Sequence, residues 1–133
     1  MSQAEVGLVE RAHRAFNERD ITTLQAICSE DVVVRLIGGF AELMGAEFRG
    51  REAALEWIKE WMGTLEGHSD VRAIQEGGGR VVAIVDVRAT GGASGAPAVM
   101  GTGFVYSFRD GQISAIDAYF VPEDALKAIG LDA

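Results

Sequence analysis

The hydrophobic pattern of the first half of the chain predicts three helices and one strand. Apolar residues recur at mostly helical spacing after the N-terminus, and Asp20 is a typical N-cap for a second helix. A β-branched segment follows, and a wide apolar stripe then indicates another helix. In chain order we expect a helix to about Glu18, a short helix after Asp20, a strand at 31–37, a loop at 38–50 and a helix at 51–65.

The second half of the chain has the pattern of an antiparallel sheet. Asp110-Gly111 is a strong hairpin signal, and Pro122 and Gly130 suit the first turn and the C-terminal cap of a last short helix. Helices precede a run of strands without strand–helix–strand alternation, so we predict a single α+β domain over residues 1–133. The strands are expected at 69–75, 80–90, 99–109 and 112–121.

Composition and charge narrow the possible partners. The 133 residues are 48% hydrophobic and 24% charged, as in a globular protein, and the net charge is −8. An acidic surface argues against a nucleic acid or an anionic membrane as partner. No apolar run is long enough to span a bilayer and no secretory signal opens the chain, so a cytoplasmic protein is expected.

The sequence predicts neither a metal site nor a bound cofactor. Cys28 is the only cysteine, and the two histidines, His13 and His68, lie on different predicted elements. Gly101-Thr102-Gly103 lies inside a strand and lacks a third glycine, so it is not a phosphate-binding loop. These two glycines instead indicate a bend or a close approach of another segment.

The strand at 80–90 carries the most informative polar residues. Its side chains alternate between two faces that both begin apolar, so we expect both faces to be covered. Asp86 and Arg88 share one of these faces. They form either an ion pair at a frayed strand end, worth little to stability, or a carboxylate with a guanidinium in a partly desolvated cavity.

Several short motifs, in order along the chain, resemble the SnoaL-like branch of the nuclear transport factor 2-like superfamily. The motifs are Ala15–Asp20 (AFNERD), Ser29–Val33 (SEDVV), Phe48–Ala53 (FRGREA), Arg109–Ile113 (RDGQI), and Glu123–Leu126 (EDAL) followed by Gly130-Leu131. The resemblance implies a strongly bent antiparallel sheet wrapped around three N-terminal helices, with a short C-terminal helix. It also implies a conical pocket and a homodimer formed through the convex face of the sheet.

The resemblance further implies which residues line the pocket. Asp86 is expected to act as general acid or base, with Arg88 adjusting it and His13 assisting proton transfer. His13 is alternatively a half-buried histidine bonded to the backbone. The residues expected to hold the substrate are Phe16, Leu36, Trp57, Trp61, Ile84, Phe104, Tyr106 and Phe120.

The resulting prediction is a pocket protein for a small apolar molecule, with acid–base catalysis of the cyclase, isomerase or lyase type. The alternative is a non-catalytic binding or interaction protein, because the general base of the related steroid isomerases is replaced by Leu36. Epoxide hydrolysis ranks third, since Ile84 and Ala118 interrupt the Asp-Arg-Asp arrangement of the related hydrolases.

Overall fold

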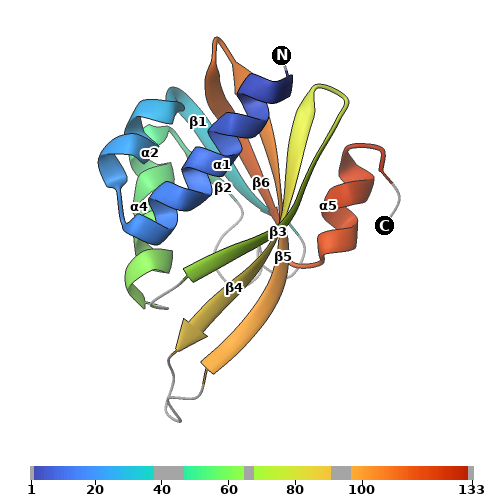
Figure 1. The fold of residues 1–133 in the computed structure, drawn as a ribbon. Coiled ribbons are helices and arrows are strands. Elements are labelled where there is room, and N and C mark those ends of the chain that lie inside the picture. Colours follow the sequence, from blue (N-terminus) through green and yellow to red (C-terminus); the bar gives the residue numbers. More distant parts are fainter. Residues whose placement is uncertain (1, 38–46, 65–67, 91–96, 132–133) are drawn as a thin grey trace.

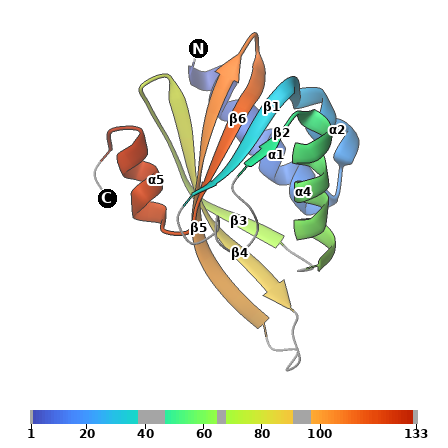
Figure 2. The ribbon, with the colours of Figure 1, turned by 180° about the vertical axis from the view of Figure 1, so that it is seen from behind.

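The computed structural model describes residues 2–37, 47–64, 68–90 and 97–131. None of the helices in these ranges is long and apolar enough to cross a membrane. Figures 1 and 2 show the fold from two opposite sides. The elements are α1 (Ser2–Glu18), α2 (Ile21–Ile27), β1 (Cys28–Ile37), β2 (Glu47–Arg49), α4 (Arg51–Thr64), β3 (His68–Gly77), β4 (Arg80–Thr90), β5 (Pro97–Arg109), β6 (Gln112–Tyr119) and α5 (Pro122–Ala128).

The strands form one curled sheet in the order β2-β1-β6-β5-β4-β3. Neighbouring strands are antiparallel except β1 and β6, which run parallel. Helices α1, α2 and α4 lie on one face of the sheet, the inner face, and α5 lies on the opposite, outer face (Figures 1 and 2). The predicted α+β class, with a bent sheet around the first helices, is therefore confirmed. The parallel pair of β1 and β6 differs from the antiparallel sheet that was expected.

Local signals in the sequence fix several element ends. The Asp20 carboxylate accepts a hydrogen bond from the Thr23 amide at 3.1 Å and so caps α2. Asp110 and Gly111 both have positive φ, which joins β5 and β6 in a tight hairpin. Gly130 is left-handed after α5, and the Leu131 amide bonds the Leu126 carbonyl at 2.9 Å. These three predictions are confirmed.

One short element differs from the sequence prediction. Residues 47–49, expected to belong to a loop, form strand β2 and pair with β1 from Val33 to Arg35. Three residues carry too little hydrophobic pattern to identify a strand, so the partner strand decides the conformation. Residues 38–46 of the predicted loop lie outside the described residues.

Both faces of the sheet are covered by apolar side chains. The inner core packs α1, α2 and α4 against the sheet and includes Val85 and Tyr106. A smaller outer cluster joins Val82 and Val105 to Ala125 and Ile129 at the C-terminal end of the chain. The prediction that both faces of the strand at 80–90 are covered is therefore confirmed.

Candidate functional site

A small cavity lies inside the inner core, between the curled sheet and the helices. Its volume is about 80 Å³ and it is partly open to solvent. No Asp, Glu, Lys or Arg is among the described residues that line it. The lining residues are Ala12, His13, Phe16, Leu24, Cys28, Trp57, Ile58, Trp61, Ser69, Val87, Phe104, Tyr106, Ile113 and Ile116.

The main polar feature of this cavity is a hydrogen bond between a tyrosine and a histidine. Tyr106 Oη lies 2.7 Å from His13 Nε2, although the two residues are 93 positions apart in the chain. Both side chains are buried, with 4% and 8% of their surface exposed. Helix α1 supplies the histidine and strand β5 supplies the tyrosine, so the bond also ties the helix to the sheet.

Burial keeps both partners of this bond uncharged near neutral pH. Desolvation lowers the pKa of His13 to about 4 and raises the pKa of Tyr106 above its ordinary value. Burial also raises the pKa of the neighbouring Cys28 thiol to about 11, so the thiolate form is disfavoured. The cavity therefore offers neutral hydrogen-bonding groups rather than charges.

Aromatic rings make up much of the remaining wall. Trp57 and Trp61, one turn apart on α4, pack edge to face with ring centroids 6.0 Å apart. Phe48 from β2 packs behind Trp57 at 6.2 Å. On the opposite side, Phe104 lies 6.0 Å from the His13 ring. Such walls suit an apolar ligand with a flat or cyclic skeleton.

The structure brings together six of the residues that the sequence singled out. These residues line one cavity, which the sequence could indicate only through the resemblance; their roles in binding or catalysis stay predictions. They are His13, Phe16, Trp57, Trp61, Phe104 and Tyr106.

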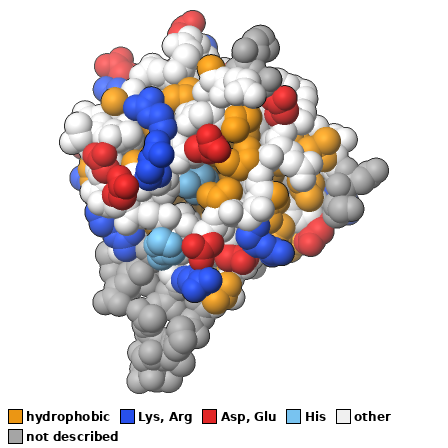
Figure 3. All heavy atoms as spheres, in the orientation of Figure 1, with side chains coloured by type: hydrophobic (Ala, Val, Ile, Leu, Met, Phe, Trp, Pro, Cys, Tyr) orange, Lys and Arg blue, Asp and Glu red, His pale blue; other side chains and the backbone are white. Residues whose placement is uncertain are grey.

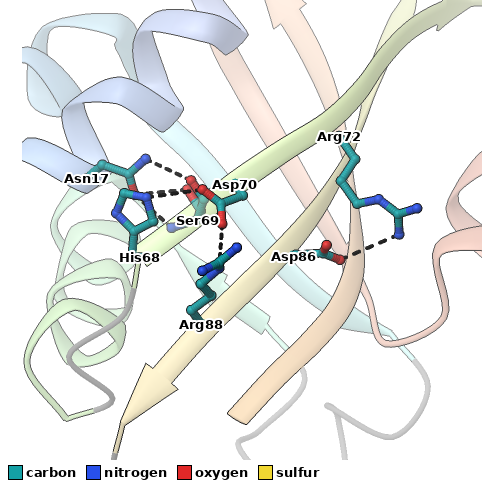
Figure 4. A network of polar contacts seen from close by, with 7 residues as sticks. All are labelled: Asn17, His68, Ser69, Asp70, Arg72, Asp86 and Arg88. Atoms are coloured by element: carbon teal, nitrogen blue, oxygen red, sulfur yellow. Dashed lines mark hydrogen bonds and ion pairs between the residues drawn. The ribbon is translucent and has the colours of Figure 1, made fainter. Parts of the chain in front are cut away.

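Asp86 and Arg88 lie on the outer face of the sheet, so their predicted position in the pocket is wrong (Figure 4). Each of the two side chains forms an ion pair with a residue of β3 instead. Asp86 Oδ1 lies 3.6 Å from Arg72 Nη1, and Arg88 Nε lies 2.6 Å from Asp70 Oδ2. The alternative interpretation, an ion pair between Asp86 and Arg88 at a frayed strand end, is not observed either, because each residue forms a separate ion pair with β3.

The register between β4 and β5 explains this reversal. Val81 pairs with Tyr106 and Ala83 pairs with Phe104, and residues opposite each other on antiparallel strands share a face. The odd-numbered residues from Val81 to Val87 therefore face the helices. Because side chains alternate, Asp86 must point outward.

Three other residues that were expected to hold the substrate are also absent from the cavity lining. Ile84 shares the outer face with Asp86 and packs against the cluster under α5. Leu36 and Phe120 belong to the inner core but do not line the cavity among the described residues. The error at Ile84 follows from the reversed face of β4.

A clamp between α1 and β3 was missed by the sequence analysis. The Asn17 amide nitrogen donates to the Ser69 carbonyl at 2.8 Å, and its oxygen accepts from the Ser69 amide at 2.7 Å (Figure 4). The side chain thus pairs with the edge of the sheet as another strand would. Asn17 follows His13 by four residues on one helix face, a spacing that was available as a signal.

The face of the molecule that Figure 3 shows has no concentration of one kind of charge. On the face crossed by α1, acidic and basic side chains alternate with hydrophobic and polar ones (Figure 3). No group of three or more His, Cys, Asp or Glu side chains in the described ranges is arranged to hold a metal ion.

Several solved structures have a fold similar to that of this chain, at low sequence identity. Bal32a, from a soil-derived mobile gene cassette, has a TM-score of 0.79 and 20% identity, with 88% of each chain covered. TerC, co-crystallised with polyporic acid, has a TM-score of 0.76 and 19% identity, covering 95% of this chain and 97% of that one. RV0760c from Mycobacterium tuberculosis, in complex with estradiol-17beta-hemisuccinate, has a TM-score of 0.73 and 16% identity, covering 87% and 92%.

Identities this low establish the fold and leave the activity open. No significant match is found among curated proteins. The sequence model of the SnoaL-like domain, however, matches residues 9–116, which is most of the chain. The chain therefore belongs to the SnoaL-like family and has the nuclear transport factor 2-like fold.

Proposed function

We propose that the protein binds a small, uncharged, largely apolar carbonyl compound in this cavity and catalyses its isomerisation or cyclisation. The observation that carries the proposal is the buried hydrogen bond between Tyr106 and His13 on an otherwise aromatic and aliphatic wall. Related folds that hold polyporic acid or estradiol-17beta-hemisuccinate support a small organic ligand. A neutral ligand fits because no described lining residue is charged.

The pair of side chains acts as a hydrogen-bond donor toward the substrate. In the productive tautomer His13 Nε2–H donates to Tyr106 Oη, which leaves the tyrosine proton free to donate to the carbonyl oxygen. In this tautomer the other ring nitrogen of His13, Nδ1, is unprotonated, so it accepts the proton that the substrate loses next to the carbonyl and returns it to the far carbon of the double bond. While the proton is on the imidazole, negative charge develops on the carbonyl oxygen. A donor already fixed in an apolar site stabilises this charge more than water does, because nothing has to reorganise.

The size of the cavity limits the substrate. A volume of about 80 Å³ is smaller than the roughly 150 Å³ of an engineered cavity that takes up benzene. A six-membered ring therefore enters with some movement of the surrounding side chains. This favours a monocyclic substrate, or one ring of a larger molecule that extends through the open side.

The test follows the conversion of cyclohex-3-en-1-one to cyclohex-2-en-1-one by the ultraviolet absorbance of the conjugated product. Tyr106→Phe removes the donor and keeps the ring, so kcat should fall roughly 100- to 1,000-fold. Tyr119→Phe is the matched control, because Tyr119 packs with the outer cluster and does not line the cavity. Unchanged turnover in Tyr106→Phe would remove the proposed role.

A second candidate is binding without turnover. It is favoured by the low pKa of His13, which makes the imidazole a weak base, and by the lack of a carboxylate among the described lining residues. In that case cyclohex-3-en-1-one binds to the wild-type protein, Tyr106→Phe weakens its binding, and no conjugated product appears above the rate in buffer.

A homodimer through the outer face of the sheet is proposed from the family resemblance. Helix α5 already covers part of this face through Ala125 and Ile129. The remaining part carries the ion pairs of β3 and β4 and the Arg35–Asp117 pair, whose atoms lie 3.0 Å apart. Light scattering of the purified chain would distinguish a dimer from a monomer.

A further inference from the structure

The open side of the cavity is bordered by α1, α4 and β5. Among the described lining residues, three are partly exposed and the others are buried. The three are Phe16 on α1, Trp61 on α4 and Phe104 on β5. Solvent therefore reaches the cavity past aromatic rings, two of which belong to α1 and α4. Because the cavity of about 80 Å³ is smaller than a six-membered ring needs, a ring that enters here requires these helices to move apart.

The C-terminal end of α1 has an arginine at a position that favours glycine. The Asp20 amide donates to the Ala15 carbonyl at 2.8 Å. The Arg19 amide donates to the Phe16 carbonyl at 3.2 Å, which completes a Schellman motif, and Arg19 has a φ of 60°. Helix α5 ends in the same motif and has Gly130 at this position, with a φ of 84°. A side chain here is strained, so we expect the arginine to supply a contact that glycine cannot.

The side chain of Arg19 links the ends of the two helices that border the opening. Its Nη1 donates to the Phe16 carbonyl of α1 at 3.0 Å, and its Nη2 donates to the Met62 carbonyl of α4 at 3.3 Å. The guanidinium carbon also lies 5.6 Å from the centre of the Phe16 ring, in a cation–π contact. Both carbonyls belong to the last turns of their helices, where a positive charge is favourable. One charged group therefore ties α1 to α4 beside the aromatic opening.

We propose that Arg19 is a strap that keeps this opening narrow and so determines the size of the molecules that enter the cavity. The inference rests on the proposed function, in which the cavity holds the ligand. While both bonds are made, α1 and α4 keep their present separation and only small molecules pass. Arg19 is exposed, so water can replace the Met62 carbonyl as the partner of Nη2. The end of α1 then moves away from α4, and a six-membered ring passes.

The test uses Cys28, the only cysteine of the chain, as a reporter inside the cavity. Cys28 lines the cavity and is 2% exposed. Methyl methanethiosulfonate and benzyl methanethiosulfonate are uncharged and differ in size, so a charge lost at residue 19 neither attracts nor repels them. Each reagent transfers its alkylthio group to the Cys28 thiolate: a disulfide forms, the sulfur–sulfur bond of the reagent breaks and methanesulfinate leaves. Mass spectrometry gives the rates at about pH 9, because burial raises the pKa of this thiol to about 11.

Arg19→Gly should increase the labelling rate with the benzyl reagent about 10-fold over the wild type, the effect of losing one hydrogen bond from a charged group. The rate with the methyl reagent should rise much less, so the ratio of benzyl to methyl labelling increases. Glycine also relieves the left-handed backbone, so this variant keeps the stability of the fold. Arg19→Gln should raise the ratio as well. Arg11→Gln, which removes an exposed charge from the same helix, is the matched control and should keep the ratio.

The outcomes separate this inference from the proposed function. An equal rise for both reagents in Arg19→Gly would overturn the strap, because unfolding of the whole chain exposes Cys28 to both without regard to size. A ratio that stays at the wild-type value, or no labelling of Arg19→Gly by either reagent, would also overturn it, and the turnover of Tyr106→Phe would still decide the proposed function. If the ratio rises but Tyr106→Phe turns over as fast as the wild type, the strap is supported and the proposed function fails.

Discussion

The two faces of strands β4 and β5 are packed differently: the inner face borders a cavity, and the outer face is in close contact with α5. On the inner face, Phe104 and Tyr106 are large and leave a cavity against α1 and α4. On the outer face, Gly103 lets α5 approach so closely that an added Cβ would lie 2.5 Å from the Ala125 Cβ. Glycine therefore lets one face of the strands pack closely, whereas large aromatic side chains on the other face leave space between the sheet and the helices.

The polar groups on the two faces differ in the same way. The inner face carries the His13–Tyr106 pair, which burial keeps neutral. The outer face carries charged pairs such as Arg88 with Asp70, whose side chains are 66% and 40% exposed. Charges therefore lie where water can solvate them, and the cavity keeps groups that tolerate desolvation.

Acid should weaken the fold through the inner face, and this is the largest effect we expect. His13 has a pKa of about 4 when folded and about 6.5 when unfolded, so the unfolded chain binds a proton more readily between these values. The free energy of unfolding should be unaffected above about pH 7, fall as the pH drops, and lose about 3 kcal/mol by pH 4.

Urea unfolding of the wild type and of His13→Gln across this pH range measures the effect. The variant lacks the titrating imidazole but keeps an amide that can bond Tyr106, so its stability should depend less on pH. The exposed His68 remains in both proteins and cancels in the comparison. Parallel pH curves for the two proteins would mean that His13 is not held neutral by burial.

Gly103→Ala should break the packing of the outer face. An added Cβ would lie 2.5 Å from the Ala125 Cβ and 3.3 Å from the Pro122 Cα, so α5 must move away. We expect a loss of about 2 kcal/mol in the free energy of unfolding, as for overpacked cores. Thermal or urea unfolding provides the measurement.

Gly101→Ala is the matched control on the same strand and face. Its added Cβ would meet Pro122 at 3.6 Å and Asp86 at 3.8 Å, which are ordinary contacts. The free energy of unfolding should stay equal or rise by up to about 1 kcal/mol, because alanine loses less backbone conformational entropy on folding than glycine does. Equal losses in the two variants would show that the strand, rather than the approach of α5, requires glycine.

The order of elements was predictable because each has a local signal. The Asp20 cap, the Asp110-Gly111 turn and the Gly130 cap act within a few residues, and the structure has all three. The two glycines in β5 also signalled a close approach, which Gly103 makes with α5. Strand β2 was not predicted because its three residues carry too little hydrophobic pattern, and only the pairing with β1 makes them a strand.

The site was predictable only in part, because the face of β4 depends on register. Val81 to Val85 are apolar on both faces, so alternation separates two sets without telling which one meets the helices. The pairing of Ala83 with Phe104 decides it, and a slip of one residue reverses every side chain. The contact of His13 with Tyr106 likewise depends on tertiary packing.

The clamp formed by Asn17 should have an intermediate effect on the inner face. Asn17→Ala removes both hydrogen bonds to the Ser69 main chain. The amide and the carbonyl of Ser69 are then unpaired at the partly buried edge of the sheet. A loss of about 1–2 kcal/mol in the free energy of unfolding is expected. Ser69→Ala removes only the hydroxyl bond of 3.2 Å and should cost less, so equal losses would contradict the clamp.

Asp86→Asn should have the smallest effect, and it tests the comparison between the faces most directly. The carboxylate lies 3.6 Å from Arg72, whose side chain is 63% exposed, so its loss should change stability by less than about 1 kcal/mol. Turnover of cyclohex-3-en-1-one, or binding of cyclohexanone, should match the wild type, whereas Tyr106→Phe in the same assay loses activity. A loss in Asp86→Asn as large as in Tyr106→Phe would mean that a carboxylate on the outer face acts through the sheet on the ligand. Asp86 would then be a positioning residue for the cavity, and the separation between a neutral inner face and a charged outer face would no longer hold.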